Sequence, residues 1–179
     1  MLNRVTISTP QEVIFSRFWD LYTSSFPTEE RRNREYQEEC MTHDNYHLEA
    51  ILNDNEFVGF IGWWSLDEIC YIEHFATSPH LRGNGYGRQA LEGFLEEQTQ
   101  HIILEVEHPT CSLSQRRIGF YSRIGFILND YHYEHPPYSL KQNEPVSLRI
   151  MSYRQALDST QMDRFRELCF REVHFIHNR

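Results

Sequence analysis

The stretch best suited to chemistry is Arg82–Gly87, with the sequence Arg-Gly-Asn-Gly-Tyr-Gly, between an apolar segment and an amphipathic one. Its glycines leave the backbone uncrowded, so successive N–H groups can point at one anion. A helix that begins here would add the positive end of its dipole. The guanidinium of Arg82 supplies donors that match phosphate oxygens. The stretch therefore predicts a diphosphate-binding turn, and a merely flexible turn is the alternative.

Two common nucleotide-binding motifs do not fit this turn. The phosphate-binding loop G-x-x-x-x-G-K-[ST] does not occur in the sequence, and Arg88 stands where the dinucleotide pattern G-x-G-x-x-G needs its last glycine. A dinucleotide domain also begins with a parallel βαβ unit, whereas this turn follows an expected hairpin. A nucleotide-binding protein of another class stays open as an alternative.

Hydrophobic periodicity predicts the elements that position the turn. Residues 46–52 and 57–64 form an expected hairpin, Ile69–Thr77 a third strand, and Gly85–Glu97 an amphipathic helix. The order of elements predicts a mixed α/β (α+β) domain with a largely antiparallel front half. The other expected elements are strands at Val5–Ser8, Ile102–Val106, from Gly125 and at Val146–Met151, and helices at Gln11–Ser25, from Thr28 to about Cys40, at Gln115–Ile124 and from about Leu157 to Phe175.

The bulk composition narrows the class of protein. A chain of 179 residues favours one domain, and a net charge of -9 argues against nucleic-acid binding while mildly favouring a cationic substrate. The four cysteines are scattered without a C-x-x-C pair, and no apolar run approaches the ~18 residues of a membrane span. With no visible export signal, these features predict a cytoplasmic protein with reduced thiols and no membrane partner.

The sequence resembles the GCN5-related N-acetyltransferases, the GNAT family. Their coenzyme A loop, Q/R-x-x-G-x-G/A, is matched by Arg82, Gly85 and Gly87, and their Y-x-x-x-G-F segment by Tyr121–Phe126. The two motifs cover about residues 70–128, with weaker similarity to Met151. The resemblance implies a twisted mixed central sheet flanked by helices. It places the acetyltransferase domain at residues 1–151 and a helical extension packed on the same domain at 152–179.

The resemblance also implies direct transfer of an acetyl group from acetyl-CoA to a primary amine in a ternary complex, without a metal. Tyr121 would protonate the departing thiolate, and a backbone N–H near Phe75–Thr77 would polarise the thioester carbonyl. Ser114 could donate to pantetheine, whereas Arg117 departs from the small residue usual in the family. The implied coenzyme-binding residues are Phe75, Ala76, Thr77, Arg82, Gly83, Asn84, Gly85, Tyr86, Gly87, Arg88 and Ser114.

The candidates for the base that accepts the proton of the amine are Glu73, Glu105 and Glu107. They lie on or beside the strands next to the loop Arg82–Gly87. We predict Glu73 and Glu107, with a solvated strand edge as the alternative for any of them. Some family members use only water.

Three other polar segments give less specific predictions. The histidine pairs 132/135 and 174/177 lack a third ligand by spacing, so no metal site is predicted. Tyr131–Tyr138, with two prolines, suggests a rigid aromatic substrate loop. The arginines at 31, 32 and 34 favour a solvated helix face over contact with an acidic acceptor.

The acceptor is predicted to be a small cationic amine. The alternatives are a non-catalytic acyl-CoA-binding module and an acetyltransferase for protein N-termini or lysines. The protein is expected to be a monomer or a homodimer.

Overall fold

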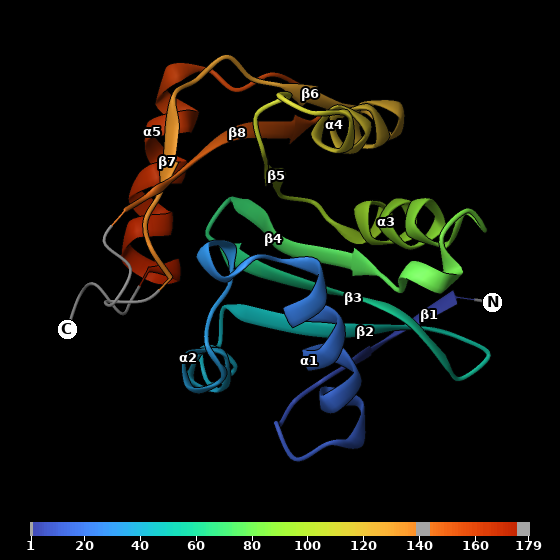
Figure 1. Ribbon diagram of the computed structural model, residues 1–179. Coiled ribbons are helices and arrows are strands. Elements are labelled where there is room, and N and C mark those ends of the chain that lie inside the picture. The colour runs from blue at the N-terminus through green and yellow to red at the C-terminus, as the bar shows by residue number, and fades with distance from the viewer. Residues whose placement is uncertain (1, 139–143, 175–179) are drawn as a thin grey trace. The chain divides into compact units, whose positions relative to one another are not determined.

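The computed structural model describes residues 2–138 and 144–174 (Figure 1). The chain divides into two compact units. The first consists of Met1–Ser65 and Ile72–Gln98, and the second of Leu66–Tyr71 and Thr99–Arg179. Both units contain strands and helices, which confirms the predicted mixed α/β class.

The strands of the first unit are β1 (Leu2–Thr6), β2 (Tyr46–Asn53), β3 (Glu56–Leu66) up to Ser65 and β4 (Ile69–Thr77) from Ile72, adjacent in that order. β1 and β3 both pair with β2 in antiparallel fashion. Asp54 and Asn55 join β2 to β3 with φ angles of 47° and 70°. Two residues in the left-handed region make the turn whose twist suits a hairpin. The predicted hairpin is therefore confirmed.

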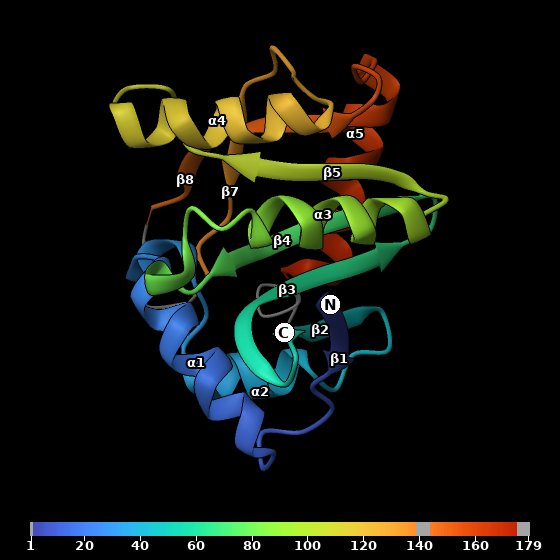
Figure 2. The ribbon, with the colours of Figure 1, turned by 90° about the vertical axis from the view of Figure 1, so that its right-hand side faces the viewer.

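A bulge in β3 lets this strand contribute to both faces of the sheet. Leu52 lies opposite Phe57 while Ile51 lies opposite Gly59, so Val58 is an extra residue that changes the alternation. Val58 packs with Ala90 of α3 (Tyr86–Glu97), whereas the ring of Phe60 lies 4.8 Å from that of Phe18 in α1 (Val13–Ser25). Figure 2 shows α3 lying along the side of β4. The two helices thus bury different faces.

Gly59 allows β3 and the end of β4 to approach each other closely. A Cβ at this position would lie 2.3 Å from the carbonyl oxygen of Ala76. The Ser78 N–H donates to the Val58 carbonyl at 2.7 Å and fixes the chain where β4 ends. The absence of a side chain at Gly59 therefore determines where residues 75–78 lie.

We expect Gly59→Ala to lower the free energy of unfolding by about 1–3 kcal/mol, because the new methyl group meets backbone atoms that cannot rotate away. Urea denaturation at neutral pH measures the change. Gly93→Ala is the matched control, since Gly93 lies inside α3 and a Cβ there meets nothing within 4 Å. Equal stability of the two variants would show that the close approach is dispensable.

Two helical predictions for the first unit are corrected. α1 begins at Val13 rather than Gln11. Glu12 is the N-cap residue with extended backbone, and its carboxylate accepts from the N–H groups of Ser8 and Thr9 before the helix, at 2.8 and 2.9 Å. The helix expected from Thr28 to about Cys40 is broken. It consists of the 3₁₀ turn η1 (Thr28–Glu30) and α2 (Arg34–Cys40), with extended backbone between them. The Asn33 side chain starts α2 by accepting from the Tyr36 N–H.

The second unit is built around β8 (Val146–Tyr153), which pairs antiparallel with β5 (His101–Val106), β6 (Phe126–Leu128) and β7 (Tyr133–His135). α4 (Ser112–Ile124) connects β5 to β6. β7 corrects the expectation that residues 131–138 form only a loop. Three of these residues join the sheet edge before the prolines, which cannot donate to a ladder, end the pairing.

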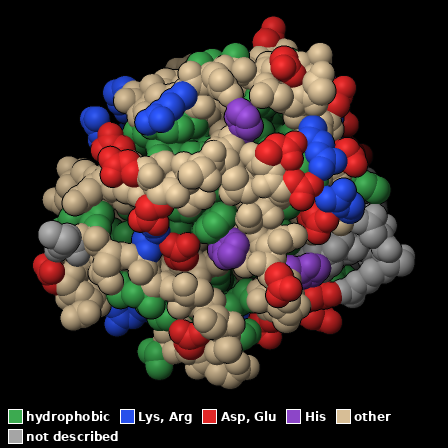
Figure 3. Space-filling model, turned by 180° about the vertical axis from the view of Figure 1, so that it is seen from behind, with side chains coloured by type: hydrophobic (Ala, Val, Ile, Leu, Met, Phe, Trp, Pro, Cys, Tyr) green, Lys and Arg blue, Asp and Glu red, His purple; other side chains and the backbone are tan. Residues whose placement is uncertain are grey.

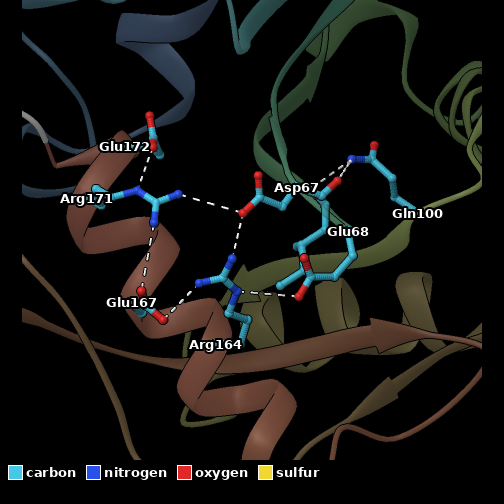
Figure 4. Close-up of polar contacts among 8 residues, drawn as sticks. Asp67, Glu68, Gln100, Arg164, Glu167, Arg171 and Glu172 are labelled. Atoms are coloured by element: carbon cyan, nitrogen blue, oxygen red, sulfur yellow. Dashed lines mark hydrogen bonds and ion pairs between the residues drawn. The ribbon is translucent and has the colours of Figure 1, made fainter.

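The C-terminal helix packs within the second unit. α5 (Ser159–Leu168) continues as the π-helical turn η3 (Cys169–Val173), and its predicted end at Phe175 lies outside the described residues. Phe165 is fully buried, with its ring 5.3 Å from Tyr71 and 5.7 Å from Tyr133. Figure 4 shows Arg164 and Arg171 of this segment bonded to Asp67 in the β3–β4 turn. The predicted domain boundary at residue 151 stays a prediction.

Candidate active site

The glycine-rich turn lies in the first unit, between the 3₁₀ turn η2 (Pro79–Leu81) and α3. Gly83 and Gly85 have φ angles of 88° and 78°, a region that favours glycine, and a Cβ at either would meet nothing within 4 Å. Gly85 caps α3 without a side-chain hydrogen bond, and Gln89 is the first residue whose N–H bonds back into the helix. The earlier N–H groups have no partner within the helix, which is the geometry of an anion site.

The side chains around this turn have different tasks. The Asn84 amide donates to the Leu81 carbonyl at 3.1 Å and holds the turn in shape. The Arg88 guanidinium forms an exposed ion pair with Glu92 at 2.8 Å on the next helical turn. Arg82 is exposed at the start of the turn. Arg82 is thus the better placed of the two cations to meet an anion from solvent.

Glu73 is the most strongly bonded acid of the first unit. Arg32 donates to its two carboxylate oxygens at 2.7 and 2.8 Å, and the Trp64 indole N–H donates at 2.8 Å. The side chains of Arg32 and Glu73 are 3% and 0% exposed. Burial acts to raise the pKa of Glu73, but the charge and hydrogen bonds of Arg32 outweigh burial and lower this pKa to about 2.

His74 adjoins this ion pair and is neutral. Burial lowers its pKa to about 4, against the opposing charge of Glu73. Its Nε2–H donates to the Glu30 carbonyl at 3.0 Å, and its ring meets those of Tyr22 and Phe26 edge-on. Glu30 at the end of η1 and Arg32 after it are therefore both bonded to β4, through His74 and Glu73.

These contacts change two predictions made from the sequence. Arg32 does not lie on a solvated helix face, because its guanidinium is buried against Glu73. Glu73 was predicted as a base, but a carboxylate with a pKa of about 2 has little affinity for the proton of an amine. The arrangement favours a structural role for Glu73.

Tyr121 lies in the second unit on α4, and it is 8% exposed. Its ring packs at 5.2 Å from Phe120 and 5.7 Å from Phe126. Burial raises the pKa of Tyr121 to about 12, although the charge of Arg117 lowers it. The phenol therefore stays protonated at neutral pH, which a proton donor requires.

Arg117 precedes Tyr121 by one helical turn and forms an ion pair with Glu107, just after β5. Both side chains are about one-third exposed. The second carboxylate oxygen of Glu107 is buried and has no hydrogen-bond partner among the described residues. Arg117, the departure from the family pattern, thus has a charge partner that spacing alone did not indicate.

Ser114 has a local structural role. Its hydroxyl donates to the Cys111 carbonyl at 3.0 Å and accepts from the Cys111 N–H at 3.2 Å, which closes the first turn of α4. The side chain is buried. Contact between Ser114 and pantetheine stays a prediction.

The predicted site residues thus fall into two sets. The first unit holds Glu73, the β4 residues Phe75–Thr77 and the turn Arg82–Arg88, and the second holds Glu107, Ser114 and Tyr121. Of the histidines considered for a metal, His177 lies outside the described residues. Within the described part of the chain no three His, Cys, Asp or Glu side chains are grouped to hold a metal ion, and no helix could cross a membrane.

A mixed sheet, a turn with left-handed glycines before α3 and a buried tyrosine on α4 are features expected of an acyltransferase. The sequence profile described as the Acetyltransferase (GNAT) family matches residues 12–126. No curated protein sequence matches the chain significantly.

Solved structures share the fold. One assigned to the GNAT family, from Bacteroides thetaiotaomicron, is 34% identical with a TM-score of 0.84, over 95% of this chain and 98% of that one. A GNAT acetyltransferase from Elizabethkingia anophelis with acetyl-CoA bound is 12% identical with a TM-score of 0.58, over 86% and 98%. A chimera of the Vibrio cholerae spermidine N-acetyltransferase SpeG with hSSAT is 14% identical with a TM-score of 0.62, over 85% and 94%.

The chain therefore belongs to the GNAT family and is an N-acetyltransferase. The predicted family, fold and enzyme class are confirmed.

Proposed function

We propose that this enzyme transfers an acetyl group from acetyl-CoA to the primary amine of a small cationic molecule, by direct attack in a ternary complex. The observation that carries the proposal is the open turn Arg82–Arg88. Its left-handed glycines and the unbonded first turn of α3 suit the diphosphate of coenzyme A. Arg82 adds a charge-assisted hydrogen bond to that diphosphate.

The end of β4 supplies the next contact. Backbone N–H groups of Phe75–Thr77 would donate to the thioester carbonyl, where negative charge grows as the amine attacks. The close approach of β3 at Gly59 and the bond from Ser78 to Val58 hold these residues in place. A rigid strand end provides donors that need no reorganisation during the reaction.

Tyr121 completes the reaction on the leaving group. The neutral amine attacks the carbonyl carbon, the carbon–sulfur bond breaks, and the phenol gives its proton to the thiolate. The phenolate then regains a proton from the nitrogen of the new amide. The positive charge of Arg117 favours the transient phenolate, whereas burial and the charge of Glu107 oppose it.

The proposed class of acceptor follows from the net charge of the chain. The chain carries a net charge of -9, and its basic side chains lie in separate small groups on the face shown in Figure 3. A negative protein attracts cations, and a spermidine acetyltransferase is among the structural neighbours. An acetyl-CoA-consumption screen of polyamines, aminoglycosides, amino acids and peptides with free N-termini tests this class. Consumption with peptides alone would replace it by a protein acceptor.

We expect Arg82→Ala to raise the Kd of acetyl-CoA about 10- to 100-fold, because one charge-assisted hydrogen bond contributes about 1.5–3 kcal/mol. The variant should use acetyl-pantetheine, which lacks the diphosphate, as well as the parent enzyme does. Calorimetry and steady-state kinetics with both thioesters measure these effects.

Arg88→Ala is the control for this prediction, because the Arg88 side chain already pairs with Glu92. Its effect on the Kd should be much smaller. If saturating acetyl-CoA fails to raise the Tm of the parent protein, the proposed donor is wrong.

A further inference from the structure

Arg117 stands where the family pattern has a small residue, and it lies on the same face of α4 as Tyr121. The two residues are four apart in the helix, which sets their Cβ atoms about 5–6 Å from each other. Side chains in a helix lean toward its N-terminus, so the Tyr121 side chain leans toward residue 117. A guanidinium stays charged at every working pH. The helix therefore places a permanent positive charge next to the phenol that serves the leaving thiolate.

Glu107 holds the guanidinium of Arg117 from outside the helix. Nη1 of Arg117 is ion-paired with Oε1 of Glu107, which directly follows β5. The two side chains are 34% and 33% exposed. An ion pair that is this accessible to water contributes little to stability. Stability of the fold therefore does not require an arginine at position 117.

The surroundings of the Tyr121 phenol make nearby charges effective. The ring is largely shielded from water and packs against those of Phe120 and Phe126. Among the described residues, the charges that act on this phenol are those of Arg117, from its own helix, and Glu107, from the segment after β5. Neighbouring β6 contributes the apolar ring of Phe126. Charges interact more strongly in such an environment than in water.

The acidity of the phenol decides how well it serves the leaving thiolate. An alkyl thiol such as cysteine has an ordinary pKa of about 8.5. Burial raises the pKa of Tyr121 to about 12, so transfer of its proton to a thiolate is uphill. Because a general acid works best when its pKa is close to that of the group it protonates, a lower pKa makes this phenol a better donor. Arg117 acts in the helpful direction, and Glu107 acts against it.

We propose that Arg117 is a positioning residue that strengthens Tyr121 as a proton donor, and that Glu107 is the counter-charge of Arg117 rather than the base for the amine. The inference rests on the proposed function. As the carbon–sulfur bond breaks, the O–H bond of Tyr121 breaks and the S–H bond of coenzyme A forms. Negative charge then lies on the phenolate next to the guanidinium. The phenolate regains a proton from the nitrogen of the new amide, and neither Arg117 nor Glu107 gains or loses one.

The test measures the rate of thiol release in a single turnover of the full-length enzyme, which separates the chemical step from product release. Two donors are compared with the best acceptor from the amine screen: acetyl-CoA, and the acetyl thioester of an acidic aromatic thiol, whose thiolate departs without a proton. We expect Arg117→Gln to lower the rate for acetyl-CoA about 3- to 10-fold and to leave the rate for the aromatic thioester unchanged. Arg117→Lys keeps the charge and should recover most of the loss.

The variant Glu107→Gln should have the opposite effect. Glutamine keeps an oxygen that accepts from Arg117 but lacks the negative charge, so the phenolate forms more readily. The rate for acetyl-CoA should rise about 2- to 5-fold, without a change for the aromatic thioester. If Glu107 were the base for the amine, the same variant would lower the rate about 100-fold or more with both donors.

Arg116→Gln is the matched control, because Arg116 is an exposed residue next to Arg117 on the same helix. It should react with both donors as the parent enzyme does. Thermal unfolding of each variant checks that it is folded. If Arg117→Gln does not fold, Glu107→Gln still tests the inference, because its expected increase in rate cannot result from damage to the structure.

Two results would overturn the inference. One is a loss in Arg117→Gln that is absent or equal for both donors. The other is a loss in Glu107→Gln with both donors. A parent enzyme that does not bind acetyl-CoA, or undiminished activity of Tyr121→Phe, would instead contradict the proposed function. Calorimetry with acetyl-CoA alone and the Tyr121 variant distinguish that failure from the first two.

Discussion

Arg32→Ala is expected to lower the free energy of unfolding by about 3–5 kcal/mol, because it leaves the carboxylate of Glu73 buried without its counter-charge. The side chain of Glu73 is 0% exposed and cannot turn to solvent without moving β4. Trp64 would still donate one hydrogen bond, but a single neutral donor does not replace a bidentate guanidinium. Urea denaturation at pH 7 measures the loss.

The pH dependence of this loss has a definite sign. In the parent protein the pKa of Glu73 is lowered to about 2, so its contribution is present above the ordinary carboxyl pKa and is lost as pH falls toward 2. The pKa of His74 is lowered to about 4, so its contribution is lost between about pH 6.5 and 4. Without Arg32, burial raises the pKa of Glu73, and this acid should then destabilise the fold as pH rises.

Two controls isolate the buried charge. Arg88→Ala removes an exposed ion pair and should change stability by less than about 1 kcal/mol. The double variant Arg32→Leu/Glu73→Leu removes both charges and should recover much of the loss. If Arg32→Ala matched Arg88→Ala in stability, the interior ion pair would not contribute to folding as we infer.

Tyr121→Phe is expected to lower kcat about 10²- to 10³-fold with little change in the KM for acetyl-CoA, because the variant lacks only the proton for the departing thiolate. The ring and its packing on Phe126 remain, so stability should change little. An acetyl thioester of an acidic aromatic thiol needs less protonation on leaving. With that donor the variant should approach the parent rate.

Tyr153→Phe is the matched control, since its ring also packs on Phe126, at 5.3 Å. It should retain full activity with both thioesters. Undiminished activity of Tyr121→Phe with acetyl-CoA would remove the phenol from the mechanism, and an equal loss with both thioesters would assign it a structural role instead.

The elements around the diphosphate turn were predictable because their signals are local. Strand β4 was expected at its observed bounds, and the hairpin follows from alternating side chains around a polar turn. The glycines indicated an uncrowded turn, and the structure shows left-handed backbone at Gly83 and Gly85. Local alternation and glycine placement thus predicted a diphosphate-binding turn, and the assignment of coenzyme A to it came from the resemblance to the GNAT family.

The partners of buried charges were not predictable in this way. Arg32 resembled a solvated residue among other arginines, and its partner Glu73 lies 41 positions away. His135 was considered for metal binding and as part of a substrate loop, and its contacts with Glu105 and His174 were not foreseen because these residues are distant in the chain. β7 was missed because two prolines directly follow three strand residues. Charge pairing across the fold depends on tertiary structure, and one sequence does not reveal it.

The β3–β4 turn acquires its partners late in synthesis. Asp67 bonds to Arg164, 97 positions later, and the buried ring of Tyr71 packs on Phe165. At translation rates of about 5–20 residues per second, these partners are synthesised roughly 5–20 s after the turn. During that interval the nascent chain exposes an aromatic surface that later becomes core. Chaperones that hold apolar segments should therefore engage this enzyme before its last helix is made.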